Sequence, residues 1–279
     1  MHPSKCRTFL AVLAMAASAF AASARAQTPS PFAYWQNSSG VVLTPLGGPV
    51  PEWSASLGMG AAAVPRYEGD DHARFVPAPA FDLRYRDIAF LSIGDGLGVN
   101  LLRGDTYRAG VALGYDTGRD QHVTERTQGL GNIDAAPEPR LFAEAAYLPF
   151  IFTADLRRAI GGHEGLIGDL GVYAPVAASE KLVVFVGPSV TFANGRYMES
   201  YFGVDEKQAL SSVEHLPFYT AHGGVKNATL GVSAIYHFTD HWLVDCDAAY
   251  ERLVGSAAGS PLVTSKDQLG FSAVLVYQF

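Results

Sequence analysis

The last ten residues, Gly270–Phe279, constrain the fold of this chain most strongly. Apolar side chains recur at every second position, and Gly270, Ser272 and Gln278 lie between them with two valines. Because successive side chains of a β-strand point to opposite faces, we expect a strand with one apolar face. The apolar row consists of Phe271, Ala273, Leu275, Tyr277 and Phe279.

The same alternation recurs upstream as about eleven segments of roughly ten residues, the length of a tilted membrane strand. Turns and longer loops alternate between them, and no stretch has the pattern of a long amphipathic helix. Single-chain bacterial barrels have an even number of strands. We therefore predict twelve strands, with ten as the alternative. A twelfth strand would lie within 38–45 or 214–222, whereas ten strands would mean one too many counted within 88–102.

The N-terminal region is predicted to be separate from the fold. Residues 1–26 combine a basic start, an apolar run at 9–22 that is too short to span a bilayer, and the small-x-small site Ala24-Arg25-Ala26. This is the pattern of a signal peptide cleaved near Ala26. Residues 27–52 are rich in Pro, Gly and Ser and are predicted to form a periplasmic leader, in which 41–43 could add a short strand. The predicted barrel covers residues 53–279.

Charge and cysteine content narrow the class of protein. Cleavage would remove Lys5, Arg7 and Arg25 and change the formal charge from −7 to −10, which argues against a nucleic-acid partner. Cys246 would be the single remaining cysteine, so no internal disulfide is possible. No later apolar run has the length of a membrane helix, so a membrane location requires a barrel.

The position of the aromatic residues favours a membrane barrel over a soluble one. They lie near the ends of the apolar rows, where interfacial girdles belong. The opposite face mixes small residues with charges of both signs, which suits a crowded, hydrated lumen. We therefore predict an all-β, transmembrane antiparallel barrel with short periplasmic turns and longer extracellular loops. The aromatic residues are Tyr85, Tyr107, Tyr115, Tyr147, Trp242, Tyr250, Tyr277 and Phe279.

A series of short motifs follows the whole predicted barrel. They are Pro65-x-Tyr67-x-Gly69, Pro77-x-Pro79, Gly96-Leu97-Gly98-x-Asn100, Gly114-Tyr115, Gly129-Leu130-Gly131, Gly161-Gly162-His163-x-Gly165, Tyr201-Phe202-Gly203-Val204, Leu216-Pro217-x-Tyr219 and Ser260-Pro261-Leu262. In their order and spacing the chain resembles the MipA/OmpV family, the MltA-interacting proteins. The resemblance implies a barrel in the outer membrane of a Gram-negative cell, in contact with its lipid.

The resemblance also implies roles and partners. Some family members are described as scaffolds between a murein hydrolase and a murein synthase. The closing strand resembles the signal read by the barrel-assembly machinery, which would involve Phe271, Leu275, Tyr277 and Phe279. The family has no established catalytic motif, cofactor or metal to carry over.

Eight charged residues are predicted to face the lumen. They could line a solute-selective pore, or they could form ion pairs that fill a narrow barrel, because charges in a confined space need partners. The predicted lumen charges are Arg84, Arg86, Arg108, Arg140, Arg157, Asp245, Asp247 and Glu251.

Two loop features are candidate sites of other kinds. The loop 195–226 carries Tyr197, Tyr201, Phe202 and Tyr219, which could bind a partner or fold back into the barrel. His163 lies in a glycine turn beside Glu164, where it could act as an acid or base or simply hold the turn by hydrogen bonding.

No Gly-x-Ser-x-Gly or Ser-x-x-Lys motif occurs. The sequence thus predicts a non-enzymatic barrel that acts as a scaffold or partner-binding protein in cell-envelope or murein assembly, with a small-solute channel as the alternative.

Overall fold

The computed structural model describes residue 46 and residues 50–147 and 149–279. The predicted signal peptide, most of the leader and the candidate strand at 41–43 lie outside them. Twelve antiparallel strands form a closed barrel in which each strand pairs with its sequence neighbours and β1 pairs with β12. This confirms the predicted architecture and strand number. The strands are β1 (Trp53–Pro65), β2 (Ala73–Tyr85), β3 (Ala89–Ser92), β4 (Gly96–Arg103), β5 (Tyr107–Asp116), β6 (Ala136–Tyr147), β7 (Phe150–Arg158), β8 (Leu166–Ala178), β9 (Leu182–Ala193), β10 (Gly224–His237), β11 (Trp242–Leu253) and β12 (Asp267–Gln278).

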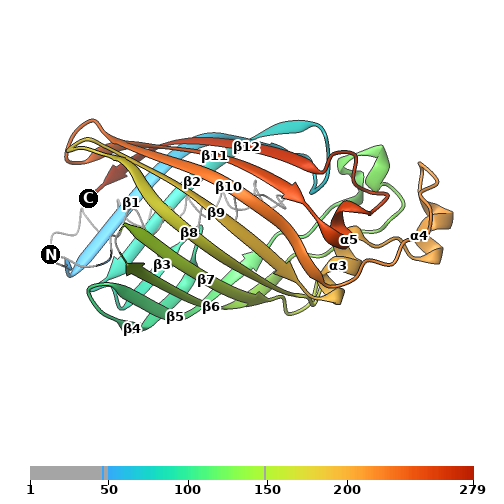
Figure 1. Ribbon diagram of the computed structural model, residues 1–279, viewed down its shortest axis with the longest axis horizontal. Coiled ribbons are helices and arrows are strands. Elements are labelled where there is room, and N and C mark those ends of the chain that lie inside the picture. The colour runs from blue at the N-terminus through green and yellow to red at the C-terminus, as the bar shows by residue number, and fades with distance from the viewer. Residues whose placement is uncertain (1–45, 47–49, 148) are drawn as a thin grey trace, which may run out of the picture.

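The two ends of the barrel differ in their connections. The start of β1 and the end of β12 lie together at one end, which we call the periplasmic end following the sequence prediction (Figure 1). The long connections lie at the other, extracellular end and carry the short helices (Figure 1). These are η1 (Gln121–Val123), η2 (Glu125–Thr127), α3 (Gly195–Phe202), α4 (Glu206–Ser211) and α5 (Gly255–Ala258). No helix in the described ranges is long and apolar enough to cross a membrane.

The twelfth strand is β3, which the sequence count missed. The suspicion that 88–102 contained one strand too many is wrong, because this range contains both β3 and β4. Residues 214–222 contribute only an isolated bridge between Val204 and Tyr219. Arg86 and Asp87 lie in the turn before β3, and both have positive φ, near 50°. Asn-Gly is the usual sequence for such a turn, so Arg-Asp gave no signal of a hairpin.

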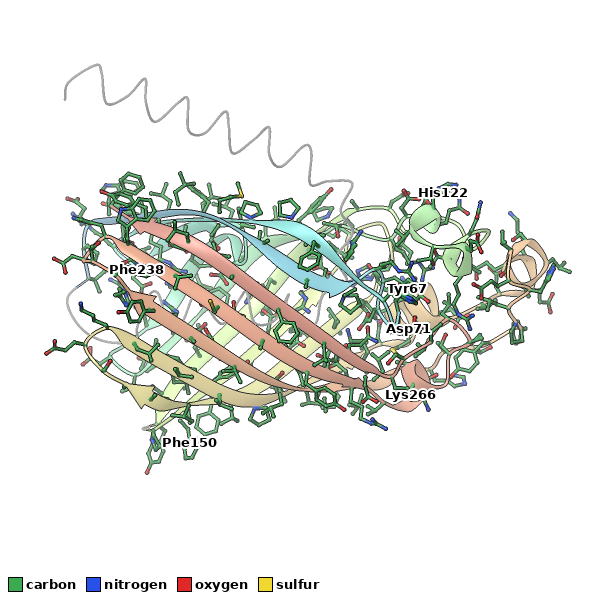
Figure 2. All side chains as sticks on the ribbon, turned by 90° about the horizontal axis from the view of Figure 1, so that it is seen from above. Tyr67, Asp71, His122, Phe150, Phe238 and Lys266 are labelled. Carbon is green, nitrogen blue, oxygen red and sulfur yellow. The ribbon has the colours of Figure 1, made fainter. Side chains whose placement is uncertain are left out.

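Large apolar side chains cover the outside of the wall. Phe75, Leu141, Leu170 and Phe271 are all exposed, whereas the residues next to them along each strand face inward. Aromatic residues gather at the periplasmic end, where several pairs of rings are in tilted or edge-to-face contact. Figure 2 shows Phe150 and Phe238 at this end, with Tyr67, Asp71, His122 and Lys266 at the other. An outward apolar band with an aromatic girdle is what a membrane barrel requires.

Ring contacts occur on both sides of the closing seam. Trp53 of β1 and Tyr85 of β2 have ring centroids 4.7 Å apart. At the end of β12, Tyr277 and Phe279 have ring centroids 4.8 Å apart. Phe279 N also donates to the carbonyl of Ala55 in β1 at 2.9 Å, so aromatic residues of the first and last strands lie at the same rim.

Candidate functional site

A continuous chain of ion pairs crosses the lumen from β2 to β8. Arg84 lies 2.9 Å from Asp82 and 3.2 Å from Asp95, which in turn lies 3.1 Å from Arg140. Arg140 also pairs with Asp155. Arg157 lies 2.7 Å from Asp155 and 2.6 Å from Asp169, and so bridges these two carboxylates. The alternation of sign gives each guanidinium two carboxylates. The chain runs through Asp82, Arg84, Asp95, Arg140, Asp155, Arg157 and Asp169.

Register explains why these groups meet. Arg140 of β6 is paired with Arg157 of β7, and Asp155 lies two positions from Arg157 on the same inward face. The two arginines therefore approach the same carboxylate from neighbouring strands. Arg108 is paired in register with Glu144, and their side chains lie 2.6 Å apart. Four of the five predicted lumen arginines are thus placed inside the barrel, in ion pairs.

Arg86 is placed elsewhere. Its side chain is 54% exposed, in the β2–β3 turn at the periplasmic rim, where it pairs with Glu52 at 2.7 Å. The alternation that assigned Arg86 to the lumen fails because β2 ends at Tyr85 and the turn redirects the chain. The prediction of Arg86 as a lumen charge therefore needs correction.

The predicted lumen acids lie on β11 and have a different environment. Asp247 accepts a hydrogen bond from Ser272 at 3.0 Å, and Asp245 lies 3.4 Å from the Ser233 hydroxyl. No ion pair to either acid occurs in the described ranges, although both are buried. These two acids are therefore held by hydroxyl groups rather than by direct contact with a cation.

Glu251, the third predicted acid, lies nearer the extracellular end of β11. It is buried, and the nearby Lys226 pairs with Glu68. All three predicted acids are thus inside the barrel, as the alternation of β11 indicated.

Apolar side chains fill other levels of the lumen. Tyr173 of β8 packs with Ala62, Val64 and Ala78 from the opposite part of the wall. Closer to the periplasmic end, Ile235, Leu243 and Val276 form a further buried cluster. The interior is thus a packed arrangement of charged and apolar layers.

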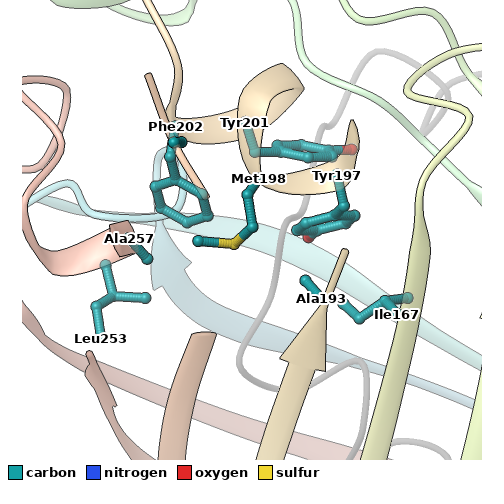
Figure 3. Close-up of a cluster of buried hydrophobic side chains, with 9 residues drawn as sticks. Ile167, Ala193, Tyr197, Met198, Tyr201, Phe202, Leu253 and Ala257 are labelled. Atoms are coloured by element: carbon teal, nitrogen blue, oxygen red, sulfur yellow. The ribbon is translucent and has the colours of Figure 1, made fainter. Parts of the chain in front are cut away.

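The candidate partner loop folds back onto the extracellular mouth. From α3, the side chains of Met198 and Phe202 are fully buried against Leu253 and Ala257 (Figure 3). The same cluster includes residues from β8 and β9, so α3 contacts several strands around the mouth. We define the plug as α3 together with this cluster of buried side chains.

All four predicted contact residues of the loop belong to the plug or pack against it. Tyr197, Tyr201 and Phe202 are buried, and Tyr219 is partly buried. Asn194 caps α3 by accepting a hydrogen bond from Tyr197 N at 3.1 Å. Of the two alternatives for this loop, the structure shows the one in which the aromatics fold back onto the barrel.

His163 holds the turn beneath this plug. Its Nδ1 accepts a hydrogen bond from Gly165 N at 2.9 Å, and its Nε2 lies 3.5 Å from both Asp116 and Glu138. Burial lowers the pKa of the ring, but the two carboxylates raise it more, to about 9. The bond from Gly165 requires that Nδ1 carry no proton, so it opposes the protonation that the two carboxylates favour, and in the neutral ring the proton lies on Nε2.

Asp116, Glu138 and His163 bring one ligand atom each within 4.8 Å of one another, and a metal ion bound there would have to displace the proton on Nε2. The side chain is also fully buried, which leaves a substrate no approach to it. The arrangement matches the structural role considered for His163, in which its ring holds the turn by hydrogen bonding.

The sequence pattern did not indicate several of the charged residues that are buried. Lys226 and Glu68 pair across 158 positions of sequence, and Arg119 donates a hydrogen bond to the carbonyl of Tyr201 at 3.0 Å. Burial lowers the pKa of the Arg119 guanidinium. These residues lie in or beside loops, where alternation carries no information about facing.

The predicted assembly-signal residues lie on or just after β12. Phe271 and Leu275 face outward, as expected for the lipid side, and Phe279 is exposed at the periplasmic rim. Tyr277 packs edge-on against Trp242, with ring centroids 4.9 Å apart. This places Tyr277 and Phe279 in the girdle, and the reading of these residues by an assembly machinery stays a prediction.

Comparisons with known proteins agree with this geometry. The family described as "MltA-interacting protein MipA" matches residues 57–279. Outer membrane protein Omp26La of Vibrio anguillarum is 32% identical over 81% of this chain and 79% of its own length. Outer membrane protein OmpV of Vibrio cholerae is 26% identical over 62% of this chain. The match spans 65% of OmpV, slightly less than two thirds of that relative.

Solved structures give weaker matches. The translocator domain of the autotransporter NalP from Neisseria meningitidis has a TM-score of 0.39 and 12% identity, covering 88% of this chain and 96% of that one. OmpT of Vibrio cholerae has a TM-score of 0.37 and 9% identity, covering 81% and 97%. At these scores the fold assignment depends on the strand pairing of the chain, and the family assignment on sequence. The chain therefore belongs to the MipA family and is an outer-membrane β-barrel of the MipA/OmpV type.

Proposed function

We propose that this protein is a non-enzymatic outer-membrane barrel that binds partner proteins of envelope assembly, with murein hydrolases of the MltA type as the first candidates. The observation that carries the proposal is the filled interior. Side chains of α3 close the extracellular mouth, and ion pairs and apolar clusters cross the lumen below it. With the interior occupied in this way, partners would bind to the outer surfaces of the barrel. The family description, which names an interaction with MltA, supports the same class of partner.

The periplasmic rim is the surface that a murein enzyme would meet. Its short turns expose charged side chains, including Arg86, Arg103, Asp105, Glu180 and Lys181. Charged rims steer association and fix the orientation of a partner more than they add affinity. We therefore expect charge reversal at this rim to weaken binding.

A pull-down from detergent-solubilised envelopes tests the proposal. Wild-type protein should recover a murein hydrolase or synthase, identified by mass spectrometry. The double variant Arg103→Glu and Lys181→Glu should recover about tenfold less, because steering by the rim charges is reversed. The matched control is Arg196→Glu, because Arg196 is exposed at the extracellular end and pairs there with Glu164 at 3.0 Å. Reproducible failure of the wild type to recover any murein enzyme would remove the proposal.

The alternative, a small-solute channel, is favoured by the charges inside the barrel. In that case purified protein in planar bilayers should show discrete conductance that changes in Arg108→Ala or Asp245→Ala. The plug instead predicts a quiet bilayer for the wild type and openings only when α3 is loosened, for example in Phe202→Ala. Discrete wild-type openings that respond to the two lumen substitutions would replace the scaffold with the channel.

A further inference from the structure

The extracellular part of β2, residues 73–80, is paired on one side only. β2 pairs with β1 along its whole length, from Trp53↔Tyr85 to Pro65↔Ala73. On its other side it pairs with β3 only from Asp82 to Tyr85. β3 and β4 form a short hairpin toward the periplasmic end (Figure 1). In the described part of the chain no strand pairs with 73–80 on that side, so the barrel closes fully only below this level.

Register shows which backbone groups point to the open side. In an antiparallel strand, alternate residues direct their N–H and C=O groups to opposite neighbours. Arg86 N donates to Glu52 O at 3.0 Å, so even-numbered residues of β2 face β1. Ile93 N donates to Phe81 O at 3.0 Å, so odd-numbered residues face the β3 side. The backbone groups of residues 77 and 79, both prolines, are therefore directed at the open edge.

The two prolines suit a permanent edge. Proline has no N–H, so residues 77 and 79 have no unpaired hydrogen-bond donor and cannot pair fully with an added strand. The carbonyl groups of residues 73, 75, 77 and 79 still point to the open side, as do the N–H groups of Ala73 and Phe75. Unpaired backbone groups are costly in hydrocarbon, so a polar group bound at this edge would be stabilised. The two prolines make the edge a poor template for an added strand.

The lumen side of this segment combines an apolar surface with an unpartnered cation. Ala78 is buried with Ala62 and Val64, and Val76 packs against the same cluster. Above them, Arg74 has its Nε and Nη2 atoms buried without a hydrogen-bond partner among the described residues. The residue as a whole is only partly buried, but leaving these two donor atoms buried and unpaired is costly, so an anionic ligand that accepts from them would be stabilised.

The geometry of other arginines indicates which anion fits. Arg84 uses Nε and Nη2 to hold Asp82, and Arg66 uses the same two atoms to hold Asp70. The corresponding two atoms of Arg74 are the side-on pair that binds a carboxylate.

We propose that the β2 edge is a lateral opening at the level of the outer leaflet for a long-chain carboxylate. Its acid group would bind Arg74, and its hydrocarbon chain would lie along the open edge beside the partly buried Val76. The occupant is a single-chain amphiphile because its two ends match the two parts of this surface. The proposal is independent of the partner-binding role, which concerns the periplasmic rim.

Site-specific quenching tests the opening. In a Cys246→Ala background, single cysteines labelled with bimane are placed at Phe75 (outward), Val76 (inward beside the open edge) and Ser233 (inward on β10, which is paired on both sides). In liposomes containing brominated lipid, Val76→Cys should be quenched nearly as strongly as Phe75→Cys, and Ser233→Cys only weakly. Equal quenching at Val76→Cys and Ser233→Cys, in protein shown to be folded by heat-modifiability, would overturn the opening.

Ligand binding tests the carboxylate. Folded protein in a non-ionic detergent is titrated with cis-parinaric acid, a fluorescent fatty acid, and Arg74→Gln should weaken binding about tenfold or more, as expected for loss of a bidentate charged contact. Arg196→Gln is the matched control and should bind as the wild type does. The methyl ester of the same fatty acid should bind equally weakly to wild type and Arg74→Gln. Unchanged affinity in Arg74→Gln, or no saturable binding to the wild type, would overturn the assignment.

Discussion

The two halves of the lumen wall accommodate buried charge in different ways. From β2 to β8, long arginines reach across strands and alternate with carboxylates, so each charge has an opposite neighbour within 3.2 Å along the chain of pairs. On β10 to β12 and β1, the inward positions hold mainly small residues, and Asp245 and Asp247 have hydroxyl groups beside them. We call these the arginine half and the acidic half.

The difference teaches that facing inward does not by itself define a role. In the arginine half the charges fill space and hold strands together. In the acidic half Asp247 lies between Ser233 and Ser272 in register, and Asp245 is its neighbour two positions away. Loss of a partner leaves a buried charge uncompensated, but loss of a charge that has no cation partner does not. The two halves should therefore respond to removal of a charge with opposite signs.

The largest effect is expected from Arg140→Ala in the arginine half. This change leaves Asp95 and Asp155 without their shared guanidinium, and breaking a buried pair costs about 3–5 kcal/mol. The free energy of unfolding, measured by urea titration of folded protein in micelles, should fall by that amount. Arg158→Ala, at an exposed position at the end of β7, is the control and should have little effect. A small loss in Arg140→Ala would mean that water already screens the pair.

The next effect is expected from Gly60→Ala in the acidic half. A Cβ at this position would clash with the carbonyl group of Ala273, so the β1–β12 backbone would have to move. Overpacking of this kind costs about 1–3 kcal/mol. The same urea titration measures it, with Ala63→Gly on β1 as a control that adds no atoms. Wild-type stability in Gly60→Ala would show that the closing strands are less closely spaced than described.

A smaller effect of opposite sign is expected from Asp247→Asn. The amide keeps the size of the side chain and can still hydrogen-bond with Ser272, while one of two neighbouring buried negative charges disappears. Stability should be unchanged or higher by up to about 1 kcal/mol. A loss as large as that of Arg140→Ala would reveal a cation bound to the acids and would end the distinction between the two halves.

The smallest effect is expected from Arg86→Asn. Asparagine tolerates the left-handed backbone that Arg86 adopts, and the change removes an exposed ion pair with Glu52 and a cation–π contact with Tyr85. The change in unfolding free energy should stay within about 1 kcal/mol. A loss comparable to that in Arg140→Ala would place Arg86 among the lumen charges after all.

Alternation along the chain, together with the even strand number of bacterial barrels, was sufficient to predict the architecture and the outward rows that include Phe271 and Leu275. The period of two is a local property of a strand, and the family motifs follow the same segments. Alternation also placed most of the lumen arginines correctly on inward faces. It misplaced Arg86 and missed β3 because a turn built from Arg-Asp carries no glycine or asparagine signal.

Tertiary structure decided the rest. Which carboxylate meets Arg140, whether Tyr197 and Phe202 bind a partner or close the mouth, and where β2 loses its neighbour all depend on register and on loops that cross large sequence distances. The stability of a closed barrel depends on which side chains lie opposite each other on neighbouring strands, and the sequence of one strand does not specify its neighbours. The closing strand Gly270–Phe279 thus indicated the architecture, while the contents of the lumen and the gap beside β2 emerged only once the strands were assembled.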